Sequence, residues 1–291
     1  MRLSALCKEY GFDRAVLTEC VSIEQPQGML HRQAQGLCLD VKAEYPFAKS
    51  ILLLMKGYTP YEEEHTEASI DAYYVVSNAA HEQAIRLAKR LNDEDIRAEM
   101  TYRIPVKPLV CRAGEGAYGR NGLISVPGFG TRVCFQTIVT ELTPETRTSA
   151  PGYVLSEECD SCHACERMCP TGALKDGRLD ITRCIRAQDE TKLLPEEMRS
   201  FMGSCILGCD ICQRCCPRNR GIGTCAPSDE LKEALKLDGL LLNGGHKKLA
   251  PFIGSNNARK MRIVNRALTA AENNGRFELL QEYKKREEDS Q

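Results

Sequence analysis

The first segments of the chain alternate between helical and strand-like spacing of apolar positions. LSALCKEYGF (3–12) has apolar residues at helical spacing and carries a glycine stop, and DRAVLTE (13–19) then predicts a strand. SILLLM (50–55) is apolar almost throughout, which is typical of a buried strand. These segments predict an N-terminal part of the α/β kind.

The same alternation continues further along the chain. An amphipathic helix is predicted over 70–95, followed by a strand over 96–104. Two β-rich runs joined by PGFG predict a hairpin over 123–142, because proline and glycine favour a tight turn between strands. From residue 229 to 291 the pattern is helical and polar, with one loop around 242–251. The order of elements therefore predicts a mixed N-terminal part and a short helical tail.

Cysteine content changes sharply along the chain. Of the 16 cysteines in 291 residues, five are scattered over 1–150 and eleven are crowded into 159–225. This change, close to the loop TPETRTSAPG (143–152), predicts a domain boundary. A chain of 291 residues is long enough for about two domains, at roughly 100–200 residues per domain. The predicted parts are 1–150, 151–228 and a short tail over 229–291.

Charge and hydropathy narrow the class of protein. The net charge is −1, which gives no reason to expect nucleic acid or membrane surface as a partner. The longest apolar run, ILLLM (51–55), is too short to span a bilayer, and the N-terminal segment lacks the apolar core of a secretory signal. We therefore expect a cytoplasmic protein without membrane contact. In a reducing compartment, a cysteine-rich chain favours metal binding over a disulfide framework.

The segment CDSCHACERMCP carries four cysteines at spacings of two, two and three residues. A run of this kind closed by Cys-Pro is the spacing of bacterial ferredoxins, in which the fourth cysteine binds the neighbouring cluster. Three thiolates on one tight loop can reach three corners of a cubane, after which the chain turns away. The four residues are Cys159, Cys162, Cys165 and Cys169.

A second run, CDICQRCCP, supplies the remaining ligands. It lacks one loop ligand, which the isolated Cys184 can replace. The prediction is a crossed assignment to two [4Fe–4S] clusters. One cluster is held by Cys159, Cys162, Cys165 and Cys216, and the other by Cys169, Cys184, Cys209 and Cys212.

Two other interpretations compete with the cluster prediction. Zinc sites use two C-x2-C pairs separated by a longer spacer, and cysteines can also be small buried hydrophobic residues. Both fit this spacing less well than a pair of clusters. Cys205, Cys215 and Cys225 are left over, and we expect a structural role for each.

A glycine-rich stretch, AGEGAYGRNGL, precedes the cysteines. Gly114-x-Gly116-x-x-Gly119 matches the dinucleotide fingerprint formally, but that fingerprint needs a strand before it and a helix after it. Here a helical segment comes before and a strand after, which argues against a Rossmann site. Two interpretations remain open: a tight helix-to-strand connection, or a loop whose bare backbone forms the wall of a cofactor site.

These segments together resemble a known family. AGEGAYGRNGL, VCFQTIVTEL, CDSCHACERMCPTGAL, the RCI around Cys184 and GCDICQRCCPRN are similar to the epoxyqueuosine reductases. The resemblance covers roughly 1–220 and is most specific over 159–219. Members of that family use cobalamin and two [4Fe–4S] clusters to remove an epoxide oxygen in the last step of queuosine synthesis in tRNA. They are related in fold and mechanism to the reductive dehalogenases.

The resemblance implies an α+β fold with three parts. An N-terminal α/β domain of the cobalamin-binding type would be followed by a bacterial ferredoxin-like domain with two clusters and a short helical tail. Cobalamin would lie between the first two parts, against the glycine-rich loop. The implied cofactor-binding residues are Gly114, Gly116, Tyr118, Gly119, Arg120 and Asn121.

The chain departs from the family at two places. The family carries an acidic residue, thought to deliver a proton, before the glycine loop, whereas MTYRIPVKP holds no carboxylate there. Tyr102 is the nearest candidate for a general acid, although it also fits the end of a strand. Longer members end in a helical-repeat domain that helps to bind tRNA. Here only ARKMRIVNRAL (258–268) resembles such a repeat, and a solvated helix face is the expected role for its basic residues.

The sequence therefore predicts an iron–sulfur oxidoreductase. Electrons from a ferredoxin or flavodoxin would pass through both clusters to a corrinoid, which would reduce a tRNA or small-molecule substrate. The alternative is an electron-transfer protein or reductive activator of a partner such as a corrinoid protein, without a substrate pocket of its own. The missing acidic residue favours the alternative, and the retained glycine loop favours the enzyme.

Overall fold

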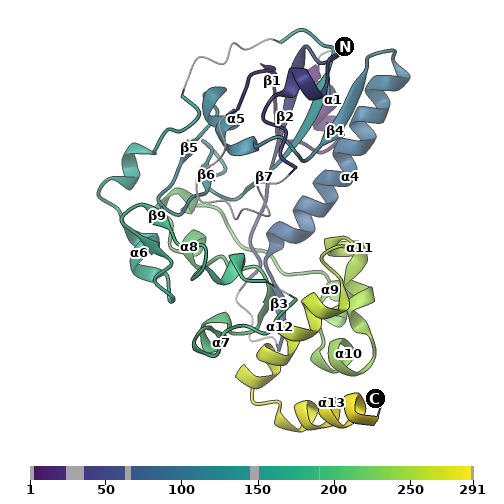
Figure 1. Ribbon diagram of the computed structural model, residues 1–291, viewed down its shortest axis with the longest axis vertical. Coiled ribbons are helices and arrows are strands. Elements are labelled where there is room, and N and C mark those ends of the chain that lie inside the picture. The colour runs from purple at the N-terminus through teal and green to yellow at the C-terminus, as the bar shows by residue number, and fades with distance from the viewer. Residues whose placement is uncertain (1–2, 24–35, 63–66, 145–150, 190, 290–291) are drawn as a thin grey trace.

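The computed structural model describes residues 3–23, 36–62, 67–144, 151–189 and 191–289. A sheet with its helices occupies one end of the molecule, the cysteine-rich segments lie beside its lower edge, and the helical tail forms the other end (Figure 1). The predicted boundary around 143–152 falls largely on 145–150, outside the described residues.

The central sheet has four strands in the order β1-β2-β7-β4, and every neighbouring pair is antiparallel. This confirms the mixture of helices and strands, while the antiparallel direction depends on pairing that spacing alone does not reveal. The strands are β1 (Arg14–Glu19), β2 (Ser50–Gly57), β4 (Ala98–Thr101) and β7 (Val133–Thr140).

Strand β2 is buried on both faces, as its continuous apolar run predicts. Leu52 and Leu54 face α1 (Leu3–Glu9) and α4 (Ala72–Asp93), and Ile51 and Leu53 face the layer on the other side. That second layer is built from α3 (Val41–Glu44), α5 (Val106–Arg112) and the small pair β5 (Ala117–Tyr118) and β6 (Ile124–Ser125).

Helix α4 begins where the sequence predicts it. The Asp71 carboxylate accepts a hydrogen bond from the Tyr73 backbone N–H at 3.0 Å and so caps the helix. The helix packs on β7 and β4, and its first turns reach α11 (Ala250–Ile253) of the tail. In Figure 1 it runs from the sheet down to the tail, so it links the two ends of the molecule.

The hairpin predicted over 123–142 is wrong. Its first strand, β6, pairs with β5, and its second, β7, lies between β2 and β4 in the main sheet. Only one bridge, Val126 to Gly130, closes the PGFG turn. The pattern identified both strands and the turn correctly, but β7 pairs with β2 and β4, which are distant in sequence, and not with β6.

The cysteine-rich region contains short elements separated by turns, as expected for loops that hold metal clusters. Helices α6 (Ala164–Met168) and α8 (Ile211–Arg214) pack against each other. The other elements are η1 (Glu157–Cys159), β8 (Leu174–Lys175), β9 (Arg178–Leu179), η2 (Ile185–Ala187), α7 (Glu196–Met202), β10 (Cys205–Leu207) and η3 (Pro217–Asn219).

The tail is helical, as predicted. The loop expected at 242–251 is mainly helical as well, because a left-handed Gly244 turns the chain directly into a 3-10 helix. The tail elements are α9 (Asp229–Ala234), α10 (Leu237–Leu242), η4 (Gly245–Leu249), α11, α12 (Lys260–Asn273) and α13 (Phe277–Asp289).

One hydrophobic core joins the tail to segments that are distant in sequence. It contains Ile263 and Ala267 of α12 together with Ile206 of β10 and Ile70 of β3 (Ser69–Ile70). Strands β3 and β10 also pair in parallel. Packing therefore crosses the predicted limits at 150 and 228, which remain a prediction as domain boundaries.

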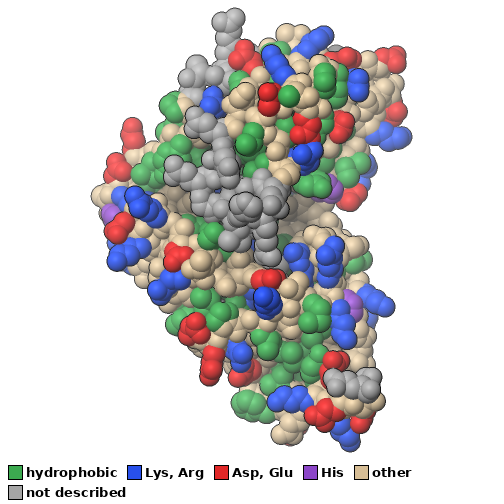
Figure 2. All heavy atoms as spheres, in the orientation of Figure 1, with side chains coloured by type: hydrophobic (Ala, Val, Ile, Leu, Met, Phe, Trp, Pro, Cys, Tyr) green, Lys and Arg blue, Asp and Glu red, His purple; other side chains and the backbone are tan. Residues whose placement is uncertain are grey.

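The surface carries no dominant charge on the face seen in Figure 2. Blue and red side chains are interspersed over both ends, in agreement with a net charge of −1. Among the described residues, no helix has both the length and the apolar character needed to cross a membrane.

Candidate metal centre and cofactor loop

The first cysteine run forms a tight loop around α6. Cys159 ends η1, Cys165 lies in α6, and Cys169 is the first extended residue after that helix. His163 adopts a left-handed conformation with φ of 47° and turns the chain between Cys162 and the helix. Its Nδ1 lies 2.7 Å from a carboxylate oxygen of Glu166. The loop therefore presents three thiols from a compact turn, and the fourth follows as the chain leaves it.

The second run is arranged around α8 in the same manner. Cys209 precedes the helix, Cys212 lies within it, and Cys216 stands at the start of η3. Cys184 precedes η2 and comes from a separate segment. All eight predicted ligands are half-buried free thiols. The packing of α6 on α8 brings the two loops together.

The pKa shifts of these thiols indicate which of them lie near one another. Burial raises the pKa of Cys209 to about 11, with Cys184 and Cys169 among the charges that add to the shift. Burial likewise raises the pKa of Cys216, and Cys159 and Cys162 add to that shift. These neighbours follow the crossed assignment predicted from the spacing. Cys165, however, is among the groups that raise the pKa of Cys212, which belongs to the other proposed set, so the ligand sets themselves remain a prediction.

Cys169 lies in surroundings that favour its thiolate. Burial acts to raise its pKa, but the Thr171 hydroxyl and the backbone N–H groups of Leu174, Ala173 and Thr171 more than compensate, so the pKa is lowered. Amide donors of this kind also bond to the sulfur ligands of iron–sulfur clusters and tune them. The residues therefore fit a cluster at this position. Within the described chain, no three His, Cys, Asp or Glu side chains converge closely enough to hold a single metal ion.

The three left-over cysteines make local contacts. The Cys205 Sγ lies 3.4 Å from the Leu207 carbonyl oxygen, and burial raises the pKa of this thiol to about 12. Cys215 contacts the Cys212 carbonyl at 3.6 Å, and Cys225 contacts that of Thr59 at 3.7 Å. The structural role expected for each of the three remains a prediction.

The glycine loop connects α5 to β6 and is packed tightly at one point. A Cβ atom on Gly116 would lie 2.6 Å from the Ser125 carbonyl oxygen, so only glycine fits there. At Gly114, by contrast, φ is +72° and no atom lies within 4 Å of the Cβ position. The loop therefore has one side packed against β6 and bare backbone on the other.

The polar residues of this loop are bonded within the protein. Arg120 donates from Nε to the Cys159 carbonyl at 2.6 Å, and its Nη1 lies 3.5 Å from a Glu166 oxygen. The buried Asn121 accepts a bond from the Leu123 N–H at 3.2 Å. The ring of Tyr118 stacks on Tyr153, with centroids 4.8 Å apart. Arg120 thus joins the loop to the first cysteine run, whereas Asn121 bonds within the loop and Tyr118 packs on Tyr153.

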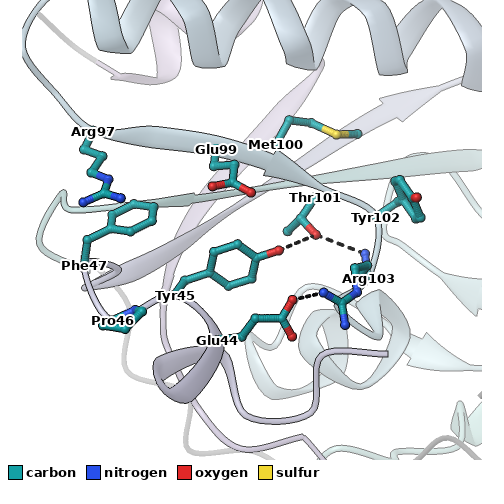
Figure 3. Close-up of a pocket in the computed structure, with 10 residues that line it drawn as sticks. All are labelled: Glu44, Tyr45, Pro46, Phe47, Arg97, Glu99, Met100, Thr101, Tyr102 and Arg103. Atoms are coloured by element: carbon teal, nitrogen blue, oxygen red, sulfur yellow. Dashed lines mark hydrogen bonds and ion pairs between the residues drawn. The ribbon is translucent and has the colours of Figure 1, made fainter. Parts of the chain in front are cut away.

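Tyr102 follows β4 at the rim of a pocket along the sheet edge (Figure 3). Its side chain is 81% exposed and turns away from Tyr45 and Thr101, which lie deeper in the pocket. The structure thus places Tyr102 near the surface at the end of the strand, and its role as a general acid stays a prediction.

Sequence reasoning missed several residues that join the sheet domain to the cysteine loops. Arg218 donates from Nε to the Ser125 hydroxyl at 2.9 Å, and the side-chain amide oxygen (Oδ1) of Asn219 accepts a hydrogen bond from the Thr131 N–H at 2.7 Å. The buried Arg132 pairs with Asp210 at 2.9 Å. The only local signal was the Arg-Asn pair that directly follows Cys216-Pro217, and its partners are some ninety residues away.

The basic residues of 258–268, for which a solvated helix face is expected, do not all face solvent. Arg266 is 4% exposed and lines a small cavity with Arg186, Met202 and Cys205. Arg262 bonds to the Asn257 side chain at 3.0 Å, and Lys260 lies 3.7 Å from Glu287. The expectation of a solvated face is therefore wrong for Arg266, because α12 packs this position against the cysteine-rich region.

The chain matches a known domain family and several curated proteins. The family described as 4Fe-4S double cluster binding domain matches residues 158–219. The chain is 34% identical over 155 residues to an epoxyqueuosine reductase of Bacillus anthracis, covering 52% of this chain and 40% of that protein. It is 30% identical over 232 residues to one of Lactococcus garvieae, covering 74% and 64%. The chain thus spans about half the length of these relatives.

Solved structures show the same fold. An epoxyqueuosine reductase from Bacillus subtilis has a TM-score of 0.75 at 24% identity, over 96% of this chain and 82% of that one. An epoxyqueuosine reductase solved with an epoxyqueuosine-modified tRNA stem loop has a TM-score of 0.73 at 23% identity, over 94% and 80%. A catabolic reductive dehalogenase has a TM-score of 0.52 at 15% identity, over 90% and 37%. The predicted resemblance is thereby confirmed, in sequence and in fold.

Proposed function

We propose that this chain, which resembles the epoxyqueuosine reductases, is an iron–sulfur reductase that acts on a modified nucleoside of RNA. The observation that carries the proposal is the contact between the glycine loop and the first cysteine run. Arg120 bonds the carbonyl of Cys159, so a group held on the glycine loop would lie directly beside the first set of thiols. Relatives named epoxyqueuosine reductase, one of them solved with a tRNA stem loop, support the oxidoreductase class and the RNA substrate.

The eight cysteines would hold two [4Fe–4S] clusters in the crossed arrangement. Cys159, Cys162, Cys165 and Cys216 would bind the one beside the glycine loop. Cys169, Cys184, Cys209 and Cys212 would bind the other, and a ferredoxin or flavodoxin is the proposed electron donor. The packing of α6 against α8 supports two neighbouring clusters, because it brings the two cysteine loops together.

Cobalamin is the proposed second cofactor. When bound, it would supply a cobalt centre that can be reduced to a strong nucleophile. The bare backbone at Gly114 fits a flat macrocycle, since no side chain stands over it. Gly116 and Gly119 shape the loop, Tyr118 stacks on Tyr153, Arg120 holds the loop against the first cysteine run, and Asn121 closes a turn within the loop by accepting the Leu123 N–H. The contribution of the last two residues would then be to position the loop.

Tyr102 is the proposed proton donor. It stands before the glycine loop where the family carries an acidic residue, and its exposed hydroxyl is free to approach a substrate from solvent. We expect Tyr102→Phe to lower turnover by roughly 100- to 10,000-fold, which is the usual contribution of a general acid. Tyr10→Phe, at the end of α1, is the control. Iron content and corrinoid affinity should be unchanged in both variants.

Anaerobic purification tests the proposal as a whole. The protein should contain about eight iron atoms and eight sulfides per chain, as two cubane clusters require. Added cobalamin should bind at one molecule per chain and stay bound during dialysis against buffer. Its visible spectrum should shift on binding. If both clusters are present and no corrinoid binds, the chain is an electron-transfer protein or activator and the enzyme proposal fails. Zinc in place of iron would refute both.

A further inference from the structure

A pocket of about 440 Å³ lies along the outer edge of β4, on the side of the sheet opposite α4 (Figure 3). Its size is within the range of sites that hold a small ligand. The polar groups at its deep end already bond to one another. The Tyr45 hydroxyl donates to the Thr101 hydroxyl at 3.1 Å, and Arg103 pairs with Glu44. The proposed cofactor loop does not line this pocket.

The outer end of the pocket offers a flat stacking surface. The Arg97 guanidinium lies over the ring of Phe47, 4.0 Å from its centroid, and Tyr45 meets Phe47 edge to face. Aromatic faces and guanidinium planes stack on the bases of single-stranded RNA, because every base has a π-face. A planar heterocycle is therefore the shape of ligand that this end accepts.

Glu99 adds an unused hydrogen-bond acceptor. Its side chain projects from β4 into the pocket, between Phe47 and Thr101 and above the ring of Tyr45 (Figure 3). Across the described residues, the side chain of Glu99 makes no hydrogen bond or ion pair, and the residue is exposed. An ionised carboxylate has two acceptor oxygens and no donor. Its complement is a ligand edge with two adjacent N–H donors.

We propose that this pocket binds a guanine base of single-stranded RNA, with the base stacked beside Phe47 and Arg97 and its Watson–Crick edge on Glu99. Guanine presents two adjacent donors on that edge, N1–H and the exocyclic amine. Adenine presents an acceptor at N1, which the carboxylate would repel. The RNA part of this inference rests on the proposed function, whereas the choice of guanine rests on the pocket alone.

Binding of labelled short oligouridines carrying one guanine, inosine or adenine tests the proposal. The cluster-loaded chain is titrated at one fixed salt concentration, and fluorescence anisotropy is recorded. The guanine oligomer should bind roughly ten- to a hundredfold more tightly than the adenine oligomer, since that is the range of a bidentate base contact. Inosine, which lacks the exocyclic amine, should fall between them.

Three variants separate the two parts of the site. Glu99→Gln should abolish the preference for guanine, because an amide has one acceptor and places a donor against the base. Phe47→Leu should weaken the binding of all three oligomers by roughly tenfold, because the base loses its stacking contact with the Phe47 ring. Glu82→Gln, an exposed acid of α4 on the other side of the sheet, should behave as wild type.

Several results would overturn the proposal. Equal binding of guanine and adenine oligomers by the wild type would do so, as would a guanine preference that survives Glu99→Gln. Guanosine competing at the dissociation constant of the oligomer would show that a free nucleoside is the ligand and would refute the RNA part. These measurements need no turnover. A chain that prefers guanine but reduces no substrate would therefore fail the proposed function and not this inference.

Discussion

Gly116 is the residue of the glycine loop at which packing demands glycine most clearly. An added Cβ would lie 2.6 Å from the Ser125 carbonyl oxygen and 2.9 Å from the Ile124 side chain, while at Gly114 the same atom would meet open space. Both positions belong to one sequence fingerprint, yet they differ in function. One fixes the loop on β6, and the other leaves backbone uncovered for a ligand.

Gly116→Ala should therefore destabilise the protein. Forcing a methyl group against β6 costs about 1–3 kcal/mol in a well-packed site, so the free energy of unfolding should fall by that amount in a denaturant titration. Gly239→Ala is the matched control, because no atom lies within 4 Å of that Cβ position inside α10. It should gain about 0.5–1 kcal/mol from helix propensity. Equal effects at both sites would contradict the packing argument.

At the scale of elements, the loop between α5 and β6 is joined to the first cysteine run through Arg120. Its guanidinium spans the Cys159 carbonyl and the Glu166 carboxylate, with the side chain 16% exposed. The sequence predicted both segments but assigned Arg120 to the cofactor. Spacing identifies residues on one loop, whereas a bond across some forty positions depends on how two loops pack.

Arg120→Gln should lower the midpoint potential of one cluster and leave the other unchanged. The guanidinium would stabilise the more negative, reduced form of a cluster held by the first cysteine run, and its removal would leave Glu166 without the positive charge 3.5 Å away. A redox titration followed by electron paramagnetic resonance measures both potentials. Arg120→Lys keeps the charge and should retain most of the potential. If both substitutions shift the potential equally, geometry and not charge is responsible.

The incorrect prediction of a hairpin over 123–142 shows that a local sequence pattern does not determine which strands pair. The two strands and the PGFG turn were predicted correctly, but β7 has eight residues that pair with β2 on one side and four that pair with β4 on the other. These ladders bury an apolar strand on both faces, which a pairing with the two-residue β6 could not do.

For the whole molecule, the tail is part of a core shared with the cysteine-rich region. The side chains of Ile263 and Ala267 are fully buried beside Ile206 and Leu207, and Leu207 lies two residues before the predicted ligand Cys209. The tail therefore supports the strand that leads into the second cysteine run. We expect unfolding of the tail to destabilise the cysteine-rich region as well.

Ile263→Ala should cost about 2–5 kcal/mol of unfolding free energy, as a large-to-small change in a packed core does. It should also speed the loss of iron in a chelator challenge. Met261→Ala, at a residue 54% exposed in the same helix, should change neither. Two separate unfolding transitions, with only the first moved by Ile263→Ala, would instead mean that the tail and the cysteine-rich region fold independently.

The sequence by itself determined the local chemistry: the cysteine spacings, the glycine loop, the helical tail and most helices and strands. These follow from residue type and short-range periodicity, which act within a few positions of the chain. Only the tertiary structure decided the antiparallel order of the sheet, the bond from Arg120 to Cys159, the burial of Arg266 and the pocket around Glu99. Each of these depends on groups that are far apart in sequence and meet only when the hydrophobic layers pack.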